Sequence, residues 1–474
     1  MSVQSEPRVN VASSNSAAQI DNSPKVDSLE GQTDLANARR FVALNRDRVL
    51  FCHAWKKWLV WDSQRWRVDT EGAVGRLAQS VADHIWELAK LADSGNARMF
   101  AARSSSSSSI KAMLALATDM LPVAPDDLDQ HPWLLNVPNG TIDLRTVELR
   151  DHRREDRITI LCPTEYDPEA GSYNWDRFLE AIFVTQDLID FVQRLFGYCL
   201  TGDVSEQILP IFWGIGANGK STLLNAFMNA LGTDYAMQAI PDLLMVKKNN
   251  SHPTERADLF GKRFVSCVET GGGQRLAVEL VKQLTGGERI RARRMREDFW
   301  EFPPTHKIIL CTNNKPRIPT TDHATWRRLG LVPFNVCFWN PDAGETGPEE
   351  LEQNKQMPEI LEEESEGILA WAVRGCLEWQ SGGLRMPDPV KEATAEYRDQ
   401  ENVLKSFIAD CCVVGPNVKT RSNQLYGQYT EWSKQNGEYT LSHRRFGEAM
   451  TQMDFKRKSS NGTWYLGITI RADA

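Results

Sequence analysis

The ten residues WGIGANGKST, Trp213 to Thr222, restrict the fold and chemistry of this chain more than any other segment. Two glycines enclose four residues, and a lysine and a serine follow at once, in the order G-x-x-x-x-G-K-S. Glycines let a backbone turn tightly and point successive N–H groups inward, where they cradle phosphate oxygens. An apolar strand pattern, ILPIFW, precedes the segment and a helical pattern, STLLNAFMNALG, follows it. This order predicts a phosphate-binding loop.

Each position of the loop has an expected role. Lys220 adds positive charge at the outer phosphates, and Ser221 offers its hydroxyl to Mg²⁺. The positive end of the following helix dipole points at the same place. The expected cofactors are therefore ATP and Mg²⁺. The residues expected to bind the nucleotide are Gly214, Gly216, Ala217, Asn218, Gly219, Lys220, Ser221 and Thr222.

Two later strands end in polar residues that suit nucleotide hydrolysis. The apolar run in KRFVSCVET ends at Glu269, and KIILCT is followed by Asn313. Open α/β sheets bind ligands at the carboxyl ends of their strands, so both side chains are expected beside the phosphates. Glu269 is the candidate ligand of the metal, and Asn313 the candidate that orients the water. Arg327 and Arg328 precede a fourth strand, and one of them is expected to reach a neighbouring subunit's γ-phosphate; a plain surface pair is the alternative.

The ordered series GANGKST, VET, LVKQLTGGERIRARR, CTNNKPRI and WRRLGLVPF resembles superfamily 3 helicases. It is most similar to the helicase part of phage and plasmid primase–helicases, a group that includes poxvirus primase–helicases. The resemblance is strong over residues 205–338 and looser on either side. It implies an AAA+-like core, ring hexamers, ATP sites between subunits, and 3′-to-5′ movement on single-stranded DNA.

The resemblance also implies roles for single residues. Lys220 and Ser221 fall in motif A, Glu269 in motif B, Asn313 in motif C, and Arg327 or Arg328 is the arginine finger. Many members have two adjacent acids in motif B, whereas here Thr270 follows Glu269. This departure leaves open whether Glu269 serves the metal, the water or both.

A basic segment, GGERIRARRMREDFWEF, precedes the motif C strand and predicts a hairpin. Period two puts Arg289, Arg291 and Arg293 on one face of its first strand. In the resembled family this element lines the ring channel. The predicted DNA-binding residues are Lys282, Arg293, Arg294 and Arg296. A solvated face or a strip of ion pairs between subunits is the alternative.

The pattern of elements predicts an α/β fold: an AAA+-like P-loop core, a mixed α+β N-terminal domain and a C-terminal winged helix. The expected parts are a disordered tail (1–32), an N-terminal α+β domain (33–165), a helical lead-in (166–204), the ATPase domain (205–345), a helical linker (346–400) and the winged helix (401–474).

Two further surfaces are candidates for nucleic acid. In the C-terminal part, two helices and a hairpin turning at Asn461-Gly462 predict the winged helix, which serves DNA or protein contacts equally well. Its basic residues are Arg444, Arg445, Lys456, Arg457 and Lys458. Near the N-terminus, four tryptophans alternate with basic residues between positions 55 and 67. An aromatic hairpin core is the favoured interpretation, and a stacking surface for single strands is the alternative.

Composition and charge restrict the classes of protein to which the chain can belong. The net charge of −8 argues against a generic basic coat for nucleic acid, although local basic elements remain effective. No apolar run approaches a membrane span, and the first residues lack the apolar core of a secretory signal. The nine cysteines are scattered without a C-x-x-C pair, which predicts reduced thiols. A cytoplasmic location, in a bacterial host cell if a phage or mobile element encodes the chain, is expected.

Together these patterns predict an ATP-dependent, ring-forming replicative DNA helicase of a phage or mobile element. Its expected partners are single-stranded or forked DNA, further copies of itself as a homohexamer, and a separate primase or polymerase, with no membrane. The alternative is a DNA-binding replication initiator that uses ATP only to assemble. The presence of Lys220, Glu269 and Asn313 together favours the motor.

Overall fold

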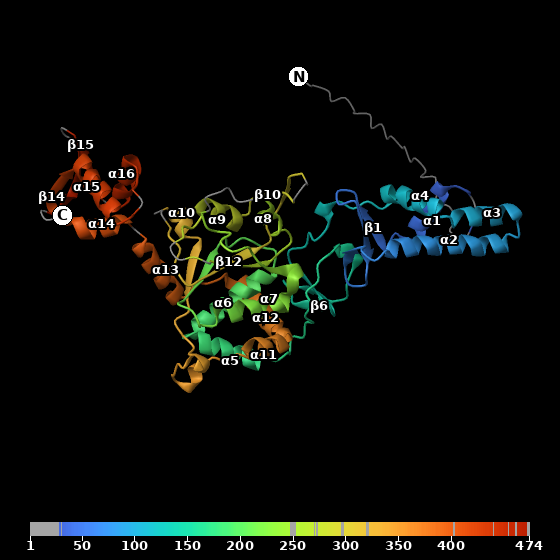
Figure 1. The fold of residues 1–474 in the computed structure, drawn as a ribbon, viewed down its shortest axis with the longest axis horizontal. Helices are drawn as coiled ribbons and strands as arrows, with labels where there is room; N and C mark the ends of the chain where they lie inside the picture. The colour runs from blue at the N-terminus through green and yellow to red at the C-terminus, as the bar shows by residue number, and fades with distance from the viewer. Residues whose placement is uncertain are drawn as a thin grey trace, which may run out of the picture. The chain divides into compact units, whose positions relative to one another are not determined.

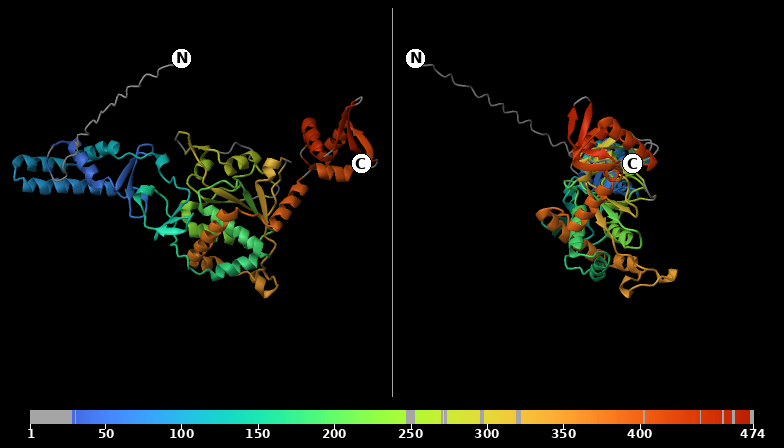
Figure 2. Two further views of the ribbon diagram at one scale, coloured as in Figure 1. Left: turned by 180° about the vertical axis from the view of Figure 1, so that it is seen from behind. Right: turned by 90° about the vertical axis from the view of Figure 1, so that its left-hand side faces the viewer.

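The computed structural model describes residues 28–29, 31–246, 253–269, 271, 274–294, 298–318, 322–401, 403–438, 440–453, 455–459 and 462–471. The predicted tail, 1–32, lies outside these residues except for its last few positions. The chain divides into two compact units, Met1–Leu128 and Asp129–Ala474, and each is described by itself. Figure 1 labels the elements, and Figure 2 gives two further views.

The first unit combines a small antiparallel sheet of strand order β1-β2-β3 with helices. Its elements are α1 (Asp34–Asn45), β1 (Val49–Cys52), β2 (Lys57–Trp61), β3 (Trp66–Val68), α2 (Ala73–Leu91), α3 (Gly95–Ser104), α4 (Ser107–Ala117), η1 (Thr118–Met120) and η2 (Pro125–Asp127). The predicted aromatic hairpin between positions 55 and 67 is present as β2 and β3, and Trp61 pairs with Trp66. Ser106 caps α4, because its side chain accepts a hydrogen bond of 3.2 Å from the Ser109 N–H.

Three tryptophans of the first unit, one buried and two half-buried, pack against other aromatic rings. Trp66 is 3% exposed. The ring of Trp58 lies edge-on to those of Phe41 and Phe51, with centroids 6.1 and 5.0 Å away. Trp61 lies 5.7 Å from Trp66. These contacts favour the aromatic-core interpretation over a stacking surface for bases.

The second unit holds the phosphate-loop motif. Its elements up to the central sheet's last strand are β4 (Leu134–Val137), β5 (Gly140–Asp143), β6 (Glu148–Arg150), η3 (Arg154–Asp156), α5 (Tyr173–Ile182), α6 (Gln186–Leu200), β7 (Leu209–Trp213), α7 (Lys220–Tyr235), β8 (Ala236–Gln238), α8 (Pro253–Ala257), β9 (Phe264–Val268), α9 (Val278–Thr285), β10 (Ile290–Ala292), β11 (Trp300–Phe302), β12 (Lys307–Thr312), α10 (His323–Trp326) and β13 (Leu329–Pro333). The elements that follow are η4 (Pro341–Ala343), η5 (Glu349–Leu351), α11 (Met357–Glu363), α12 (Ser365–Gly382), α13 (Asp388–Gln400), α14 (Val403–Cys411), β14 (Cys412–Arg421), α15 (Ser422–Gln435), α16 (His443–Gln452), β15 (Arg457–Ser459) and β16 (Thr463–Ile470).

The central sheet is parallel throughout, with strand order β13-β7-β12-β9-β8. The strand before the glycine-rich segment, β7, therefore lies next to β12, and β12 lies next to β9. All their carboxyl ends meet at one edge of the sheet. This topology brings the ends of the three predicted functional strands together, and it confirms a mixed α/β fold.

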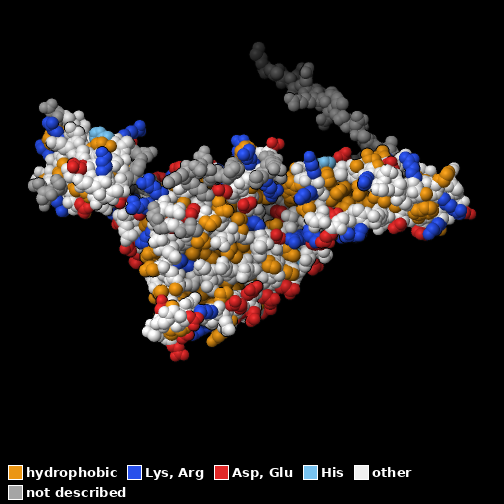
Figure 3. Space-filling view, in the orientation of Figure 1, with side chains coloured by type: hydrophobic (Ala, Val, Ile, Leu, Met, Phe, Trp, Pro, Cys, Tyr) orange, Lys and Arg blue, Asp and Glu red, His pale blue; other side chains and the backbone are white. Residues whose placement is uncertain are grey.

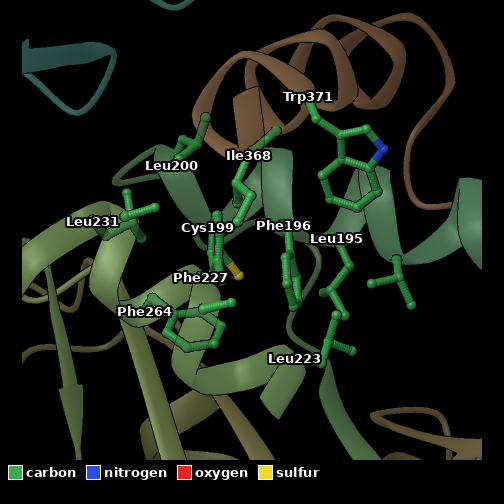
Figure 4. Packing of buried hydrophobic residues seen from close by; sticks show 14 of the residues in the cluster. Leu195, Phe196, Cys199, Leu200, Leu223, Phe227, Leu231, Phe264, Ile368 and Trp371 are labelled. Atoms are coloured by element: carbon green, nitrogen blue, oxygen red, sulfur yellow. The ribbon is translucent and has the colours of Figure 1, made fainter. Parts of the chain in front are cut away.

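The sheet is buried on both faces because its strands send alternate side chains into two cores. Along β12, Ile308 joins one core and Ile309 the other. Helices α6, α7 and α12 lie together on the second face (Figures 1 and 2), where the rings of Phe196 and Phe227 stack 4.2 Å apart. Trp371 of α12 meets Phe196 edge-on, as Figure 4 shows. Such two-sided burial is typical of parallel sheets.

Helices α6 and α12 approach closely because each carries a glycine at the crossing. A Cβ on Gly197 would lie 2.0 Å from the Cys376 backbone nitrogen, and a Cβ on Gly375 would lie 2.1 Å from the Gln193 carbonyl oxygen. Helix α12, which falls in the segment 346–400 predicted as a helical linker, is therefore part of the main core.

The predicted end of the N-terminal domain at residue 165 also differs from the structure, which divides the chain after Leu128. The sheet of β4, β5 and β6 packs into the second unit: the Asn136 N–H donates to the Tyr235 hydroxyl at 3.0 Å. The turn between β4 and β5 is formed by Pro138 and Asn139, since Val137 pairs with Gly140. None of the helices in the described part of the chain combines the length and apolar character needed to cross a bilayer.

The C-terminal segment builds a small α/β module from α14 onward. Its sheet has the antiparallel order β14-β16-β15. Phe407 and Phe446 from the helices and Tyr465 from β16 form its core. The predicted helices and hairpin are present, while α14 and β14 were not foreseen in detail. Of the predicted turn pair, Asn461 lies outside the described residues.

Candidate active site

The glycine loop, residues 214–219, joins β7 to α7 with an unusual backbone. Gly216, Ala217 and Gly219 have φ of 127°, 45° and 79°. Positive φ is easy for glycine, but at Ala217 it costs about 1 kcal/mol or more. The strain is consistent with a functional loop, because alternating left- and right-handed residues turn their N–H groups into one concavity.

Two glycines of the loop are required by close contacts. A Cβ on Gly214 would lie 2.2 Å from the Asn218 amide nitrogen, and a Cβ on Gly219 would lie 2.5 Å from the Ile182 side chain of α5. The loop is thus held between its own asparagine and the preceding helix. Larger residues would open it.

Lys220 is buried, with 4% of its surface exposed, and its ammonium already has a full set of partners. Its Nζ donates to the Gly214 carbonyl at 2.7 Å, to Asn218 Oδ1 at 2.8 Å and to Asn313 Oδ1 at 3.2 Å. An ammonium has three protons, so all are used. Burial lowers the pKa of Lys220. An incoming anion would replace at least one of these neutral acceptors.

Glu269 and Asn313 lie at adjacent strand ends, as predicted. The Glu269 N–H donates to the Cys311 carbonyl at 3.2 Å, and the Thr312 hydroxyl donates to Glu269 Oε2. The second carboxylate oxygen, Oε1, is buried and has no hydrogen-bond partner among the described residues. Burial raises the pKa of Glu269, and the bond from Thr312 opposes the rise. Thr312 was not singled out from the sequence, because a threonine that ends a strand carries no signal of its own.

The unpartnered oxygen of Glu269 makes the site suitable for a small hard cation. Ser221 lines the same cavity with its hydroxyl. Mg²⁺ prefers oxygen ligands and often takes only one or two from the protein, with phosphates and water supplying the rest. Among the described residues no group of three or more His, Cys, Asp or Glu side chains forms a ready metal cage. The residues therefore fit Mg²⁺ that arrives with a nucleotide.

A cavity of about 600 Å³ extends from this edge of the sheet. Its lining includes the glycine loop with Lys220, Glu269 and Asn313. It also includes α5 and residues between Phe338 and Pro358. These last two parts could not be predicted from the sequence, because they come from segments more than a hundred residues apart and carry no motif.

The two candidate arginines differ in their surroundings. The Arg328 Nη1 donates to Gln207 Oε1 at 2.7 Å, and its carbonyl accepts from the Leu209 N–H at 2.6 Å. Because β13 and β7 are parallel, Arg328 lies at the amino end of the sheet, opposite Lys220. Arg327 is exposed, and no hydrogen bond or ion pair of its side chain occurs among the described residues. Neither arginine serves the glycine loop of its own chain.

The basic hairpin is present as β10 and β11, which pair antiparallel. Ile290 and Ala292 are buried while Arg291 between them is exposed, as the period-two pattern predicts. Figure 3 shows Lys and Arg side chains on the surface around β10. Arg296 lies outside the described residues.

The described hairpin arginines lie over aromatic rings. The Arg293 guanidinium is 5.0 Å from the Phe299 ring centre, and that of Arg294 is 5.5 Å from the ring of Trp300. Such cation–π contacts hold the stems while leaving N–H groups for other partners. Arg294 is exposed and Arg293 is half-buried.

Lys282 is not free for DNA in this structure. Its Nζ lies 2.8 Å from Asp322 Oδ2 and 3.5 Å from Glu279 Oε1. The hydrogen bond from Lys282 lowers the pKa of Asp322 to about 2. Asp322 also caps α10 by accepting from the Ala324 N–H at 3.1 Å. Lys282 therefore connects α9, just before the basic hairpin, to the helix that leads into Arg327.

The basic residues of the C-terminal module are only partly available. The Arg457 Nη2 donates to the Tyr465 hydroxyl at 3.0 Å, and the Arg444 Nε donates to Glu448 at 3.0 Å. Lys456 and Lys458 are exposed. The side chain of Arg445 lies outside the described residues.

Comparison with known proteins places these features in a wider group. A family described as "D5 N terminal like" matches residues 38–184, and a family of unknown function, DUF5906, matches residues 212–328. "Putative helicase L207/L206" of Acanthamoeba polyphaga mimivirus is 29% identical over 325 residues, which is 65% of this chain and 34% of that protein. "Putative primase C962R" of African swine fever virus is 25% identical over 333 residues, again 65% of this chain and 34% of that protein. The predicted resemblance to viral and phage primase–helicases is confirmed.

These viral relatives are much longer than the chain, which spans 34% of the length of each. Among solved structures, the apo form of the NrS-1 C terminal region is matched with a TM-score of 0.47 and 11% identity, over 93% of this chain and 100% of that one. The DUF5906 match runs from β7 to Arg328 and so includes the glycine loop, Glu269 and Asn313.

Proposed function

We propose that the chain is an ATP-hydrolysing DNA helicase that works as a ring. The observation that carries this proposal is the convergence of Lys220, Asn313 and the half-buried Glu269 at one edge of a parallel sheet, beside a cavity of about 600 Å³. The position of β12 between β7 and β9 is the order expected of an AAA+-like P-loop core. Similarity to viral proteins named as helicase and primase supports the same assignment.

In this proposal each residue of the set has one task during hydrolysis. The glycine-loop N–H groups and Lys220 hold the β- and γ-phosphates of ATP, and Lys220 exchanges its present neutral acceptors for phosphate oxygens. Ser221 and Glu269 would hold Mg²⁺, which would neutralise charge on the phosphates. Asn313, released from Lys220, orients the attacking water by hydrogen bonds without adding charge.

The arginine finger in this scheme is Arg327 and acts on the neighbouring subunit. It is exposed and lies at the sheet edge opposite its own glycine loop, so a second copy of the chain is needed to bring it to a γ-phosphate. A ring of six copies, as the resembled family has, gives every site such a neighbour. Arg328, bound to Gln207, positions the start of β13 instead.

DNA binding is assigned to the basic hairpin first and to the C-terminal module second. Arg293 and Arg294 present guanidinium groups that suit backbone phosphates without reading sequence. The order helix–strand–helix–helix–hairpin from α14 to β16 supports a winged helix. Its exposed Lys456 and Lys458 lie on the wing. Single-stranded or forked DNA is the proposed substrate, and a separate primase or polymerase a further partner.

The test measures hydrolysis and strand separation on the same preparation. We expect ATPase activity that single-stranded DNA increases, and unwinding of a fork with a 3′ tail but not of one with only a 5′ tail. An Mg²⁺-dependent ATPase without unwinding on either fork would favour the rival, an initiator that uses ATP only to assemble on DNA. Absence of ATP hydrolysis under all these conditions would refute both.

A further inference from the structure

The C-terminal sheet, of strand order β14-β16-β15, packs one face on helices and turns the other face outward. Tyr465 of β16 is buried in the core of the module with Tyr429 of α15 and Phe446 of α16. Trp464 and Leu466 lie on the opposite face, because successive residues of a strand alternate between the two sides. Both are half-buried. The outer face therefore keeps a tryptophan in partial contact with solvent.

Basic residues surround Trp464 on this outer face. In the register of the sheet, Arg421 of β14 and Lys458 of β15 lie directly opposite it on the two flanking strands. Lys419 lies two residues before Arg421 and so shares its face. The Lys419 ammonium and the Arg421 guanidinium are each 5.2 Å from the centre of the Trp464 ring. All three basic residues are exposed, so that an outside partner can reach their charges.

No acidic residue in this sheet neutralises these charges. Residues 412–421 and 456–471 contain no Asp or Glu, and their basic residues are Lys419, Arg421, Lys456, Arg457, Lys458 and Arg471. Arg457 donates inward to the Tyr465 hydroxyl, and Arg471 donates to the Cys412 carbonyl at 3.2 Å. None of the other four forms an ion pair with a described residue. In a chain of net charge −8, this local concentration of positive charge suits a polyanion.

The exposed part of the tryptophan indicates which kind of polyanion fits. Inside a duplex the bases stack on one another, and only their edges can be reached from the grooves. The bases of a single strand are open, and they stack on aromatic rings and arginine planes while basic groups hold the backbone phosphates. The Trp464 ring and the Arg421 guanidinium offer both kinds of stacking surface. Lys419 and Lys458, on the two strands that flank β16, offer contacts to phosphates.

We infer that the outer face of the C-terminal sheet binds single-stranded DNA, with an unpaired base stacked at Trp464 and the backbone held by Lys419, Arg421 and Lys458. The inference deepens the proposed function, from which it takes DNA as the partner. It adds a site that distinguishes unpaired from paired DNA and that a different segment of the chain builds than the basic hairpin. Binding there needs no nucleotide, because none of these residues lines the cavity beside the glycine loop.

The test measures the affinity of the full chain, without ATP, for a single-stranded thymidine oligonucleotide and for a duplex of the same length. Trp464→Ala should weaken single-strand binding about tenfold, as the loss of one stacked base does, and change duplex binding less than about twofold. Trp464→Phe keeps an aromatic ring and should bind within about threefold of the parent. Melting temperatures of both variants check that the module stays folded.

A matched pair of lysine variants separates this face from the rest of the module. Lys419→Ala should make the log–log salt slope of single-strand affinity shallower by roughly 0.7, the value for one phosphate contact. The control, Lys434→Ala, removes the same charge from an exposed position on α15 and should leave the slope unchanged. Equal effects of the two variants would assign the binding to general charge and overturn the site.

Photochemical cross-linking locates the contact directly. A single strand that carries iododeoxyuridine should form an adduct with Trp464, identified by mass spectrometry, since this base couples to aromatic rings on which it stacks. Unchanged single-strand affinity in Trp464→Ala, or absence of this adduct, overturns the inference and leaves the proposed function standing. Equal loss of single-strand and duplex binding in Trp464→Ala also overturns it, because Trp464 would then only support the module.

The same measurements keep the inference distinct from the proposed function. Lys220→Ala should lose ATP hydrolysis but keep both the single-strand affinity and the Trp464 adduct, because the two sites share no residue. Loss of the adduct in Lys220→Ala would contradict a site that works without nucleotide. No binding of single-stranded DNA by the parent would refute the proposed function together with the inference.

Discussion

The glycine loop and the basic hairpin hold their positive charges in opposite environments. Lys220 is buried and satisfied by three internal acceptors, while Arg294 is exposed and rests on the face of Trp300. The contacts of Lys220 fix its charge in one place at the cost of desolvation. The exposed guanidinium of Arg294 stays hydrated and can move. A change at the first site should therefore alter the chemistry steeply, and a change at the second should alter affinity gradually and in proportion to salt.

The largest effect is expected from Lys220→Ala, which removes the buried charge at the outer phosphates. ATP hydrolysis should fall more than about a thousandfold, since both binding and transition-state stabilisation are lost. Steady-state ATPase assays measure it, and circular dichroism should show an intact fold. Hydrolysis within tenfold of the parent would contradict the proposal that Lys220 holds the outer phosphates.

Arg327→Ala should reduce hydrolysis about a thousandfold, the lower range for an arginine finger. Arg328→Ala, its neighbour, should cost far less activity and chiefly lower the melting temperature, because its side chain binds Gln207. Mixing Arg327→Ala with Lys220→Ala chains should restore part of the ATPase, as one interface then holds both intact halves. No recovery in confirmed mixed rings would contradict action between subunits.

Glu269→Gln should lower hydrolysis about a hundredfold while ATP still binds, because the amide keeps the hydrogen bond with Thr312 but loses the metal's charge partner. Burial raises the pKa of Glu269 above its usual 4.5, so parent activity should fall as pH drops through that raised value. The variant should lack this acid limb in its pH–rate profile. A variant whose profile keeps the limb would assign the titration to another group.

For the hairpin, Arg293→Ala together with Arg294→Ala should leave basal ATPase unchanged and abolish its stimulation by single-stranded DNA. The log–log salt slope of DNA affinity should become shallower by roughly 0.7 for each DNA phosphate that the double variant no longer neutralises. The paired control is Arg444→Ala in the C-terminal module. If only the control changes the slope, DNA is held by that module and not by the hairpin.

The smallest effect is expected at Lys282, which the structure pairs with Asp322. Lys282→Met should reduce the free energy of unfolding by about 0.5 kcal/mol, as partly exposed ion pairs do, and change DNA affinity less than twofold. Asp322 has a lowered folded-state pKa of about 2, so its contribution is present above pH 4 and fades as pH falls toward 2. Chemical denaturation of both single variants and the double variant would show a shared, non-additive loss. A large loss of DNA affinity in Lys282→Met would instead support the original prediction that this lysine binds DNA.

Features that depend on a local sequence pattern could be predicted, and features that depend on long-range contacts could not. The glycine loop, Glu269 and Asn313 could be located because each depends on a local pattern, a turn or a strand end, and a parallel sheet must bring such ends together. The ion pair of Lys282 with Asp322 could not be predicted, because the two residues are forty positions apart. Taken alone, each has the pattern of an exposed charged side chain. The part of the cavity lining between Phe338 and Pro358 escaped notice for the same reason: its acidic, proline-bearing sequence resembles an ordinary surface loop until the fold places it beside the cavity.

The glycine crossing of α6 and α12 has a consequence for how the protein is made. Gln193 and the Trp371 carbonyl that it binds are 178 residues apart in the chain. At about 5–20 residues per second, a ribosome needs roughly 10–35 s to deliver the second helix after the first. During that interval α7 can cover part of the apolar surface of α6, but the part that packs against α12 has no partner. Nascent chains are thus expected to depend on chaperones until α12 arrives, and truncations that end before it should aggregate even though they contain the entire glycine loop.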